Sequence, residues 1–138
     1  MAKKPTWGWV SSPAKPKAPS VPASFKAEVS AQVNAWVEAV LKPKFIEPPP
    51  PEADRNYLVD IQTKWNRQYF YLESRYRCPS PNAISPEFDL KFARLEYVQP
   101  GCFNLSFQRH TGQWFGLLQG ASLEECLTRI ESDPLFMP

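Results

Sequence analysis

The amino-acid sequence predicts an α+β fold in which a five-stranded antiparallel β-meander sheet carries an N-terminal and a C-terminal helix on one face. Apolar and polar residues alternate through successive segments between residues 57 and 118, which is the period of half-buried strands. Apolar residues at spacings of three and four precede this region over 24–42 and follow it over 122–133. The predicted order is therefore helix, five strands and helix, with a single core.

A Pro-rich and Lys-rich segment comes before the predicted domain. Residues 1–22 contain no acidic residue and no hydrophobic period, so they cannot bury enough apolar surface to offset the entropy lost on ordering. We predict a flexible arm over 1–22 and one α+β domain over 23–138. The chain has 138 residues, which is the size of one ordinary domain.

The first helix is predicted from a stripe of apolar side chains on one face. Ser24 is the expected N-cap, and Pro43 is expected to stop the helix soon after Leu41. A run of four prolines, Pro48–Pro51, then predicts a stiff and extended spacer. The residues of the stripe are Phe25, Val29, Val33, Trp36, Val37, Val40 and Leu41.

The first three strands are predicted from alternation and from the loops between them. Tyr57–Trp65 and Tyr69–Cys78 each alternate strictly and are joined by a short turn, and prolines mark 79–86 as a loop. Phe88–Val98 changes phase, which indicates either a bulge near Phe92–Arg94 or burial on both faces.

The end of the chain completes the sheet and supplies the second helix. Pro100–Gly101 and Thr111–Gly112 are turn signals on either side of a fourth strand, and Trp114–Leu118 supplies a fifth. Ser122 and Glu125 have the spacing of a capping box, and the apolar Leu135–Met137 is expected to pack against the sheet. The predicted inward-facing residues include Val59, Ile61, Phe70, Leu72, Phe103, Leu105 and Phe107.

Several classes of chemistry are not favoured by this sequence. Cys78, Cys102 and Cys126 are widely spaced and form no CxxC pair, which favours buried thiols in a reducing, cytoplasmic compartment over disulfides or zinc. His110 is the only histidine, and the chain has no nucleotide-binding loop or nucleophile motif. No apolar run is long enough for a membrane span. We therefore expect a protein without a cofactor or a membrane partner, and not an enzyme.

The favoured function is that of an accessory or adaptor protein that binds a larger protein or assembly through its N-terminal arm. Trp7 and Trp9 are large aromatic residues on an otherwise polar segment, where they can fill pockets of a partner. Docking of the two rings back onto the domain is the competing interpretation. The basic residues that would steer the arm to an acidic surface are Lys3, Lys4, Lys15 and Lys17.

A second function, single-stranded nucleic-acid binding, is predicted from the sheet face opposite the helices. Aromatic and basic residues are interleaved there, so bases can stack on the rings while cations meet phosphates. The competing interpretation is a solvated face with ordinary cross-strand pairs. The residues predicted for this site are Lys64, Tyr69, Tyr71, Arg75 and Arg77.

A third function is a small-ligand or enzyme site at the turn before the last strand. His110, Thr111, Gln113 and Trp114 bring an imidazole, a hydroxyl, an amide and an indole within five residues. As a turn the segment needs no function, whereas as a site it would be a small polar recognition patch.

Overall fold

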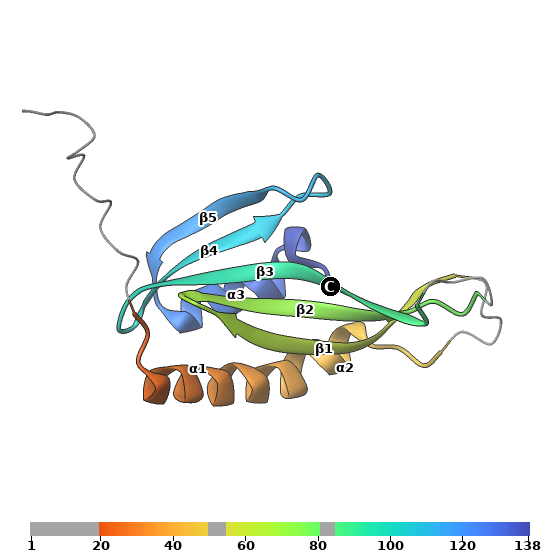
Figure 1. Ribbon diagram of the computed structural model, residues 1–138, viewed down its shortest axis with the longest axis horizontal. Coiled ribbons are helices and arrows are strands. Elements are labelled where there is room, and N and C mark those ends of the chain that lie inside the picture. The colour runs from red at the N-terminus through yellow and green to blue at the C-terminus, as the bar shows by residue number, and fades with distance from the viewer. Residues whose placement is uncertain (1–19, 50–54, 81–84) are drawn as a thin grey trace, which may run out of the picture.

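The computed structural model describes residues 20–49, 55–80 and 85–138. Five strands form one antiparallel sheet in the order β1-β2-β3-β4-β5, with one helix before the sheet and one after it (Figure 1). The predicted fold class is therefore confirmed. Residues 1–19 of the predicted arm and Pro50–Pro51 of the predicted spacer lie outside the described residues. The predicted flexibility of the arm therefore stays a prediction.

The helices and strands lie close to their predicted ranges. The helical segments are α1 (Ala23–Trp36), the π-helical turn η1 (Val37–Leu41), α2 (Lys42–Phe45), α3 (Leu123–Ser132) and the short 3-10 turn η2 (Pro134–Phe136). The strands are β1 (Tyr57–Asn66), β2 (Tyr69–Arg77), β3 (Glu87–Gln99), β4 (Cys102–Gln108) and β5 (Trp114–Ala121).

The first helix begins earlier than the cap signal indicated. Its N-cap is Pro22, and no side chain accepts a hydrogen bond from its first turn. The prediction that Ser24 caps the helix is therefore wrong, because Ser24 already lies inside α1. At α3, by contrast, the Ser122 and Glu125 capping box is present as predicted.

The same helix also continues past Pro43, which was expected to end it. The backbone N–H of Lys42 donates to the carbonyl of Val37, five residues earlier, so the helix widens into a π turn just before the proline. In a regular α-helix the Pro43 ring would clash with the carbonyl four residues before it. The wide turn removes this conflict, and Pro43 then occupies the first turn of α2, where no N–H donor is needed.

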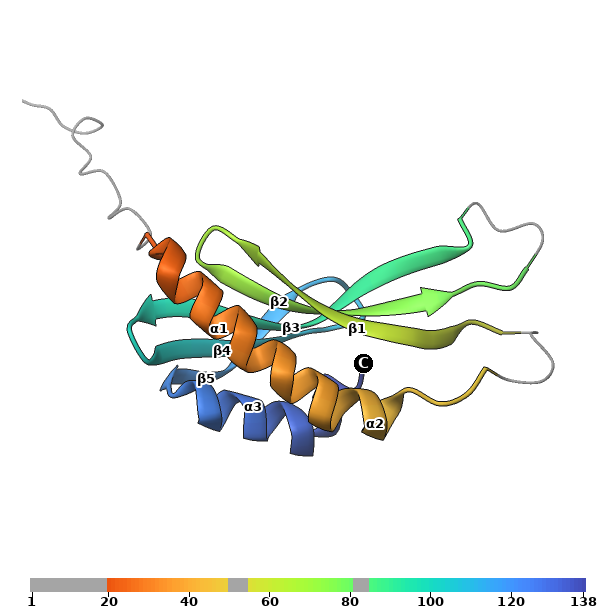
Figure 2. The same cartoon turned by 90° about the horizontal axis from the view of Figure 1, so that it is seen from below.

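Both helices pack against one face of the sheet, as Figure 2 shows from the helix side. The two are also tied together, because Lys44 Nζ donates to the carbonyl of Glu131 at 2.8 Å. The buried core includes Val29, Val33, Val37 and Leu41 from the first helix, Ile61, Phe70, Leu72, Leu95, Phe103 and Leu105 from the sheet, and Cys126, Leu127 and Ile130 from α3.

The C-terminal segment packs through one of its three apolar residues. Phe136 is 1% exposed and meets the ring of Phe107 edge-on, whereas Leu135 and Met137 are 49% and 66% exposed. The prediction that all three residues pack on the sheet is therefore right for Phe136 and wrong for its neighbours. A single turn of 3-10 helix cannot point three consecutive side chains in the same direction.

Bulges in β1 and β3 change which residues face the core. The pairing of β2 with β3 skips Phe92, which confirms a bulge at the predicted phase change. The pairing of β1 with β2 skips Val59, and Leu58 packs against the core instead. The expected inward position of Val59 is therefore wrong, because one extra residue reverses the alternation on its far side.

Within the three described stretches, no helix is both long enough and apolar enough to cross a bilayer.

Candidate functional site

The sheet face opposite the helices carries a group of side chains that we call the aromatic–cation cluster. It consists of Tyr69 and Tyr71 from β2, Arg94 from β3 and Trp114 from β5. Two of these residues were predicted for this face as nucleic-acid contacts. The other two join them only because the strands bring them together.

The cluster is built around the guanidinium group of Arg94. Its carbon Cζ lies 4.5 Å from the Tyr69 ring centroid and 4.8 Å from that of Trp114. The Tyr71 ring centroid lies 6.2 Å from Tyr69 and 5.8 Å from Trp114. Lys91 adds a second cation, with Nζ 5.3 Å from the Tyr71 centroid. All these distances lie within the range of aromatic and cation–π contacts.

Strand register explains how Trp114 reaches a residue two strands away. Arg94 pairs with Ser106, and Ser106 pairs with Gly116, so small residues occupy the positions between β3 and β5. Trp114 itself is opposite Gln108, one step along the same face. Ser106 is only 7% exposed although it stands on this face. The absence of bulky side chains there leaves room for the indole to lie across β4.

The Arg94 cation contacts two aromatic rings and makes no ion pair with the described residues. Among the described residues no salt bridge to Arg94 is found, and its Nε is buried without a hydrogen-bond partner. The negative faces of the two rings offset part of the cost of removing the guanidinium from water. The arrangement therefore holds a planar cation in place through ring contacts.

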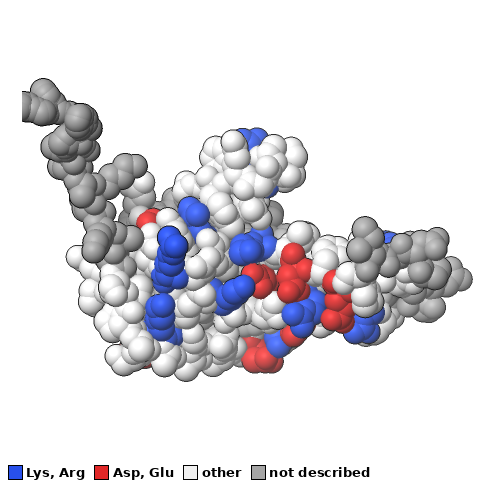
Figure 3. All heavy atoms as spheres, viewed as in Figure 1, with Lys and Arg blue, Asp and Glu red and all other residues white. Residues whose placement is uncertain are grey.

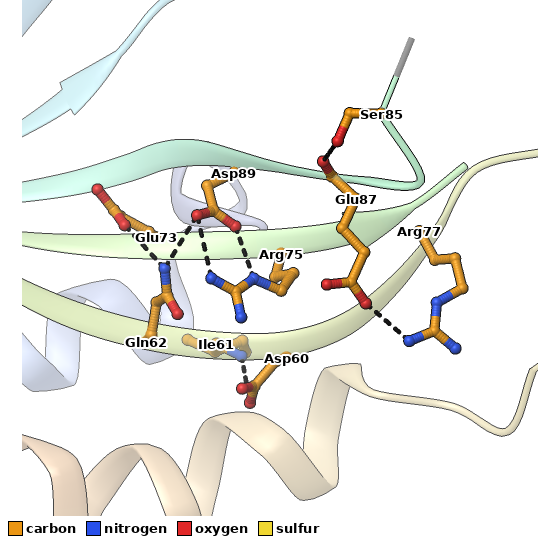
Figure 4. A network of polar contacts seen from close by, with 9 residues as sticks. All are labelled: Asp60, Ile61, Gln62, Glu73, Arg75, Arg77, Ser85, Glu87 and Asp89. Carbon is orange, nitrogen blue, oxygen red and sulfur yellow. Dashed lines mark hydrogen bonds and ion pairs between the residues drawn. The ribbon is translucent and has the colours of Figure 1, made fainter. Parts of the chain in front are cut away.

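The other end of the same face is arranged differently, because its bases are paired with acids (Figure 4). Arg75 makes a two-point contact with Asp89, with Nε 2.9 Å from Oδ1, and Arg77 lies 2.7 Å from Glu87. The hydrogen bond from Arg75 lowers the pKa of Asp89 below its ordinary value. Arg75 and Arg77, both predicted as phosphate contacts, therefore have their charge offset within the protein.

The distribution of charge on this face follows the same division. In Figure 3, Lys and Arg gather on the left of the face, near the β1–β2 turn, with few acids among them, whereas acids and bases alternate further right. Lys64, predicted for the site, is exposed and pairs with Tyr71 in register. The uncompensated positive charge thus lies at the same end as the rings.

The residues predicted for a ligand site at the last turn do not converge. Trp114 belongs to the aromatic–cation cluster, whereas Thr111 and Gln113 are exposed at the turn. His110 lines a pocket with Ser74 and residues of the C-terminal segment. β4 ends at Gln108, so the alternation of that strand does not extend to His110.

The predicted contacts of the arm cannot be placed. The residues Lys3, Lys4, Trp7, Trp9, Lys15 and Lys17 all lie outside the described part of the chain.

Sequence reasoning left Arg94 and Trp114 out of the nucleic-acid site, although a signal for Arg94 was present. The phase change near Phe92 moves Arg94 to the face that carries Tyr71, so assigning the bulge would have placed it there. For Trp114 no such signal exists along the chain, because its face and its neighbours follow from the pairing of β5 with β4, in which Trp114 is opposite Gln108.

Two observations on the described residues concern metal ligands and one of the thiols. Over 20–49, 55–80 and 85–138, no group of three or more His, Cys, Asp or Glu side chains could hold a metal ion. Burial raises the pKa of Cys126 to about 12, so this thiol is a poor nucleophile at neutral pH.

The fold and the site define a small α+β protein with one sheet face covered by helices and the other carrying aromatic and cationic side chains. The chain belongs to the family described as "Domain of unknown function (DUF3024)", which matches residues 21–138. Comparison with curated proteins and with solved structures finds no match.

Proposed function

We propose that the protein binds single-stranded nucleic acid on the open face of its sheet, through the aromatic–cation cluster. The observation that carries this proposal is the position of Arg94 between the rings of Tyr69 and Trp114, without an ion pair to any of the described residues. Aromatic stacking surfaces and positive charge are the two elements that sequence-tolerant binding of single strands combines.

Each part of the cluster has a role in this proposal. Bases stack on Tyr69, Tyr71 and Trp114, which offer ring faces suited to any of the bases. Arg94 and the nearby Lys64 meet phosphates, which carry most of the affinity and make it depend on salt. Arg75 and Arg77 contribute less than predicted, because Asp89 and Glu87 already occupy them.

The test is a titration of labelled oligothymidylate and oligoadenylate with the full chain, followed by fluorescence anisotropy at several salt concentrations. The logarithm of the affinity should fall with the logarithm of salt, with a slope of about 0.7 for each phosphate neutralised. Trp114→Ala removes a stacking surface and should cost about 1–3 kcal/mol, or roughly five- to 150-fold in affinity.

Two arginine substitutions with the same charge change separate site binding from general attraction. Arg94→Gln and Arg75→Gln each remove one positive charge from this face. If the aromatic–cation cluster is the site, Arg94→Gln weakens binding by about tenfold or more, and Arg75→Gln has a much smaller effect. Equal effects would refute the proposed site, and an absence of salt-dependent binding to any single strand would refute the function.

A second function, binding of a larger protein through the arm, is supported by the two tryptophans in a basic segment, Trp7 and Trp9. The test is capture from nuclease-treated lysate with the full chain and with a truncation that begins at residue 20. The truncation should keep Val21, because that residue packs against the core. Partners that depend on the arm would support this function, and identical captures would exclude it.

A non-enzymatic role in the cytoplasm remains part of the proposal. It is supported by the wide spacing of the three cysteines and by the lack of a nucleotide-binding or nucleophile motif in the sequence.

A further inference from the structure

The sheet separates into two parts near the bulge in β3, and this creates a pocket on the helix side. Glu87–Lys91 pairs only with β2, and β4 joins β3 from Ala93 onward. Figure 1 shows the β4–β5 hairpin turning away from β3 beyond this point. A pocket of about 440 Å³ lies between β3, the β4–β5 turn and the C-terminal segment. This volume is within the range of small-molecule sites.

Large apolar side chains are exposed in the walls of the pocket. Leu90 is 54% exposed, and it lines the pocket with Phe92, Leu135 and Met137. Leu135 and Met137 are also among the most exposed large apolar side chains of the described residues. Such clustering of exposed apolar side chains marks binding surfaces more often than chance.

A buried hydroxyl without a partner lines the same pocket. Ser74 is 1% exposed, and its Oγ has no hydrogen-bond partner among the described residues. Its neighbour on β2, Tyr76, is satisfied, because its hydroxyl donates to the backbone oxygen of Pro138 at 2.7 Å. Buried polar groups are almost always paired, so the unpaired Oγ of Ser74, a residue that lines the pocket, can take a polar partner.

The charged side chains around the pocket favour an anion. Among the described residues no Asp or Glu side chain lines it, whereas the cation of Arg109 does. The Arg109 guanidinium carbon lies 4.9 Å from the Phe115 ring, and Phe115 pairs with Phe107, whose ring packs against Phe136 on the helix side. This places the cation on the same side of the sheet as the pocket. Lys91 directs its ammonium to Glu73 and Tyr71 on the other side.

We propose that this pocket binds a small carboxylic acid with an apolar body and a second, hydroxyl or carbonyl, oxygen. The apolar body lies against Leu90 and Phe92, the carboxylate meets Arg109, and the second oxygen pairs with Ser74. The pocket and the aromatic–cation cluster lie on opposite faces of the sheet, so this inference is independent of nucleic-acid binding.

The test uses three probes that differ in one group each, with the full chain and isothermal titration calorimetry. ω-Hydroxydecanoate carries all three features, decanoate lacks the second oxygen, and decanediol lacks the charge. ω-Hydroxydecanoate should bind at one site, and about tenfold more tightly than either of the others.

Matched variants assign each preference to a residue. Ser74→Ala should remove the preference for ω-hydroxydecanoate over decanoate, because the hydroxyl that recognises the second oxygen is gone. Arg109→Gln should remove the preference over decanediol, whereas Lys64→Gln, which removes a cation from the other face, should leave it unchanged. Preferences that survive in both pocket variants would overturn the proposal.

A substitution in the pocket wall tests the location itself. Leu90→Glu places a carboxylate in the pocket and should weaken binding of ω-hydroxydecanoate by about tenfold or more. Val98→Glu is the control, because Val98 is also an exposed apolar residue of β3, at 40%, but does not line the pocket. Circular dichroism verifies that both variants fold. Absence of saturable binding by the unaltered protein, or equal effects of the two variants, would overturn the proposal.

Discussion

Phe136 is expected to anchor the C-terminal segment, and replacing it with alanine tests this directly. The side chain is 1% exposed and contacts Phe107 with ring centroids 6.3 Å apart, whereas its neighbours Leu135 and Met137 are largely exposed. Complete burial of a Phe side chain contributes about 1.5–3 kcal/mol by transfer alone, and the cavity left by its removal adds to this. We therefore expect Phe136→Ala to cost about 3–5 kcal/mol in the free energy of unfolding.

The assay is urea denaturation followed by far-ultraviolet circular dichroism, with Met137→Ala as the control. Since small domains are stable by about 5–15 kcal/mol, Phe136→Ala should move the urea midpoint far below that of the unaltered protein. Met137→Ala should stay within about 0.5 kcal/mol. A loss below about 1 kcal/mol for Phe136→Ala would show that the segment is not packed as described, and would remove one wall of the proposed pocket.

Three further predictions concern the cap, a buried thiol and a turn. Ser122→Ala should cost about 1 kcal/mol, measured by urea denaturation. The Ser122 backbone N–H and hydroxyl lower the pKa of Glu125, so this cap stabilises the fold above the ordinary Glu pKa and its contribution is lost as pH falls through the lowered value. Glu125→Gln removes the charge that this pKa describes, and a cost of Glu125→Gln that is equal at neutral and strongly acidic pH would contradict this. Cys126, 0% exposed with a pKa of about 12, should react with a thiol reagent only after unfolding; rapid labelling of the folded protein would contradict its burial. Gly101→Ala should lower the free energy of unfolding by about 1 kcal/mol, because φ is 75° at that position. Gly116→Ala is the control and should cost less, because φ is ordinary there. Equal losses of stability would exclude backbone strain as the cause.

Local patterns along the chain were sufficient for the order of the elements. Strict alternation in Tyr57–Trp65 and Tyr69–Cys78 reflects burial of one face only, and the capping box at Ser122 satisfies backbone donors through residues three apart. These signals depend on neighbours in sequence. They could therefore be read without knowing what each element packs against.

Local patterns failed where an element adjusts to a distant constraint or to one extra residue. Pro43 was read as a stop, but the preceding π turn accommodates it, and Val37 and Leu41 on that turn are buried against the sheet. Val59 was assigned to the core by parity, but a bulge in β1 gives that place to Leu58. Packing decides both outcomes, because the free energy gained by burying these side chains exceeds the cost of an irregular turn or bulge.

Sequence patterns alone predict the helix, sheet and helix order and place two tyrosines on the open face. The contact of Arg94 and Trp114 with those tyrosines follows from tertiary structure, because it crosses β4 and depends on strand order, on a bulge and on the small side chain of Ser106. Tertiary structure also decided that Arg75 and Arg77 are paired with acids and that an unpaired Ser74 lines a pocket. Alternation assigns a residue to a face, but the neighbours on that face come from other strands.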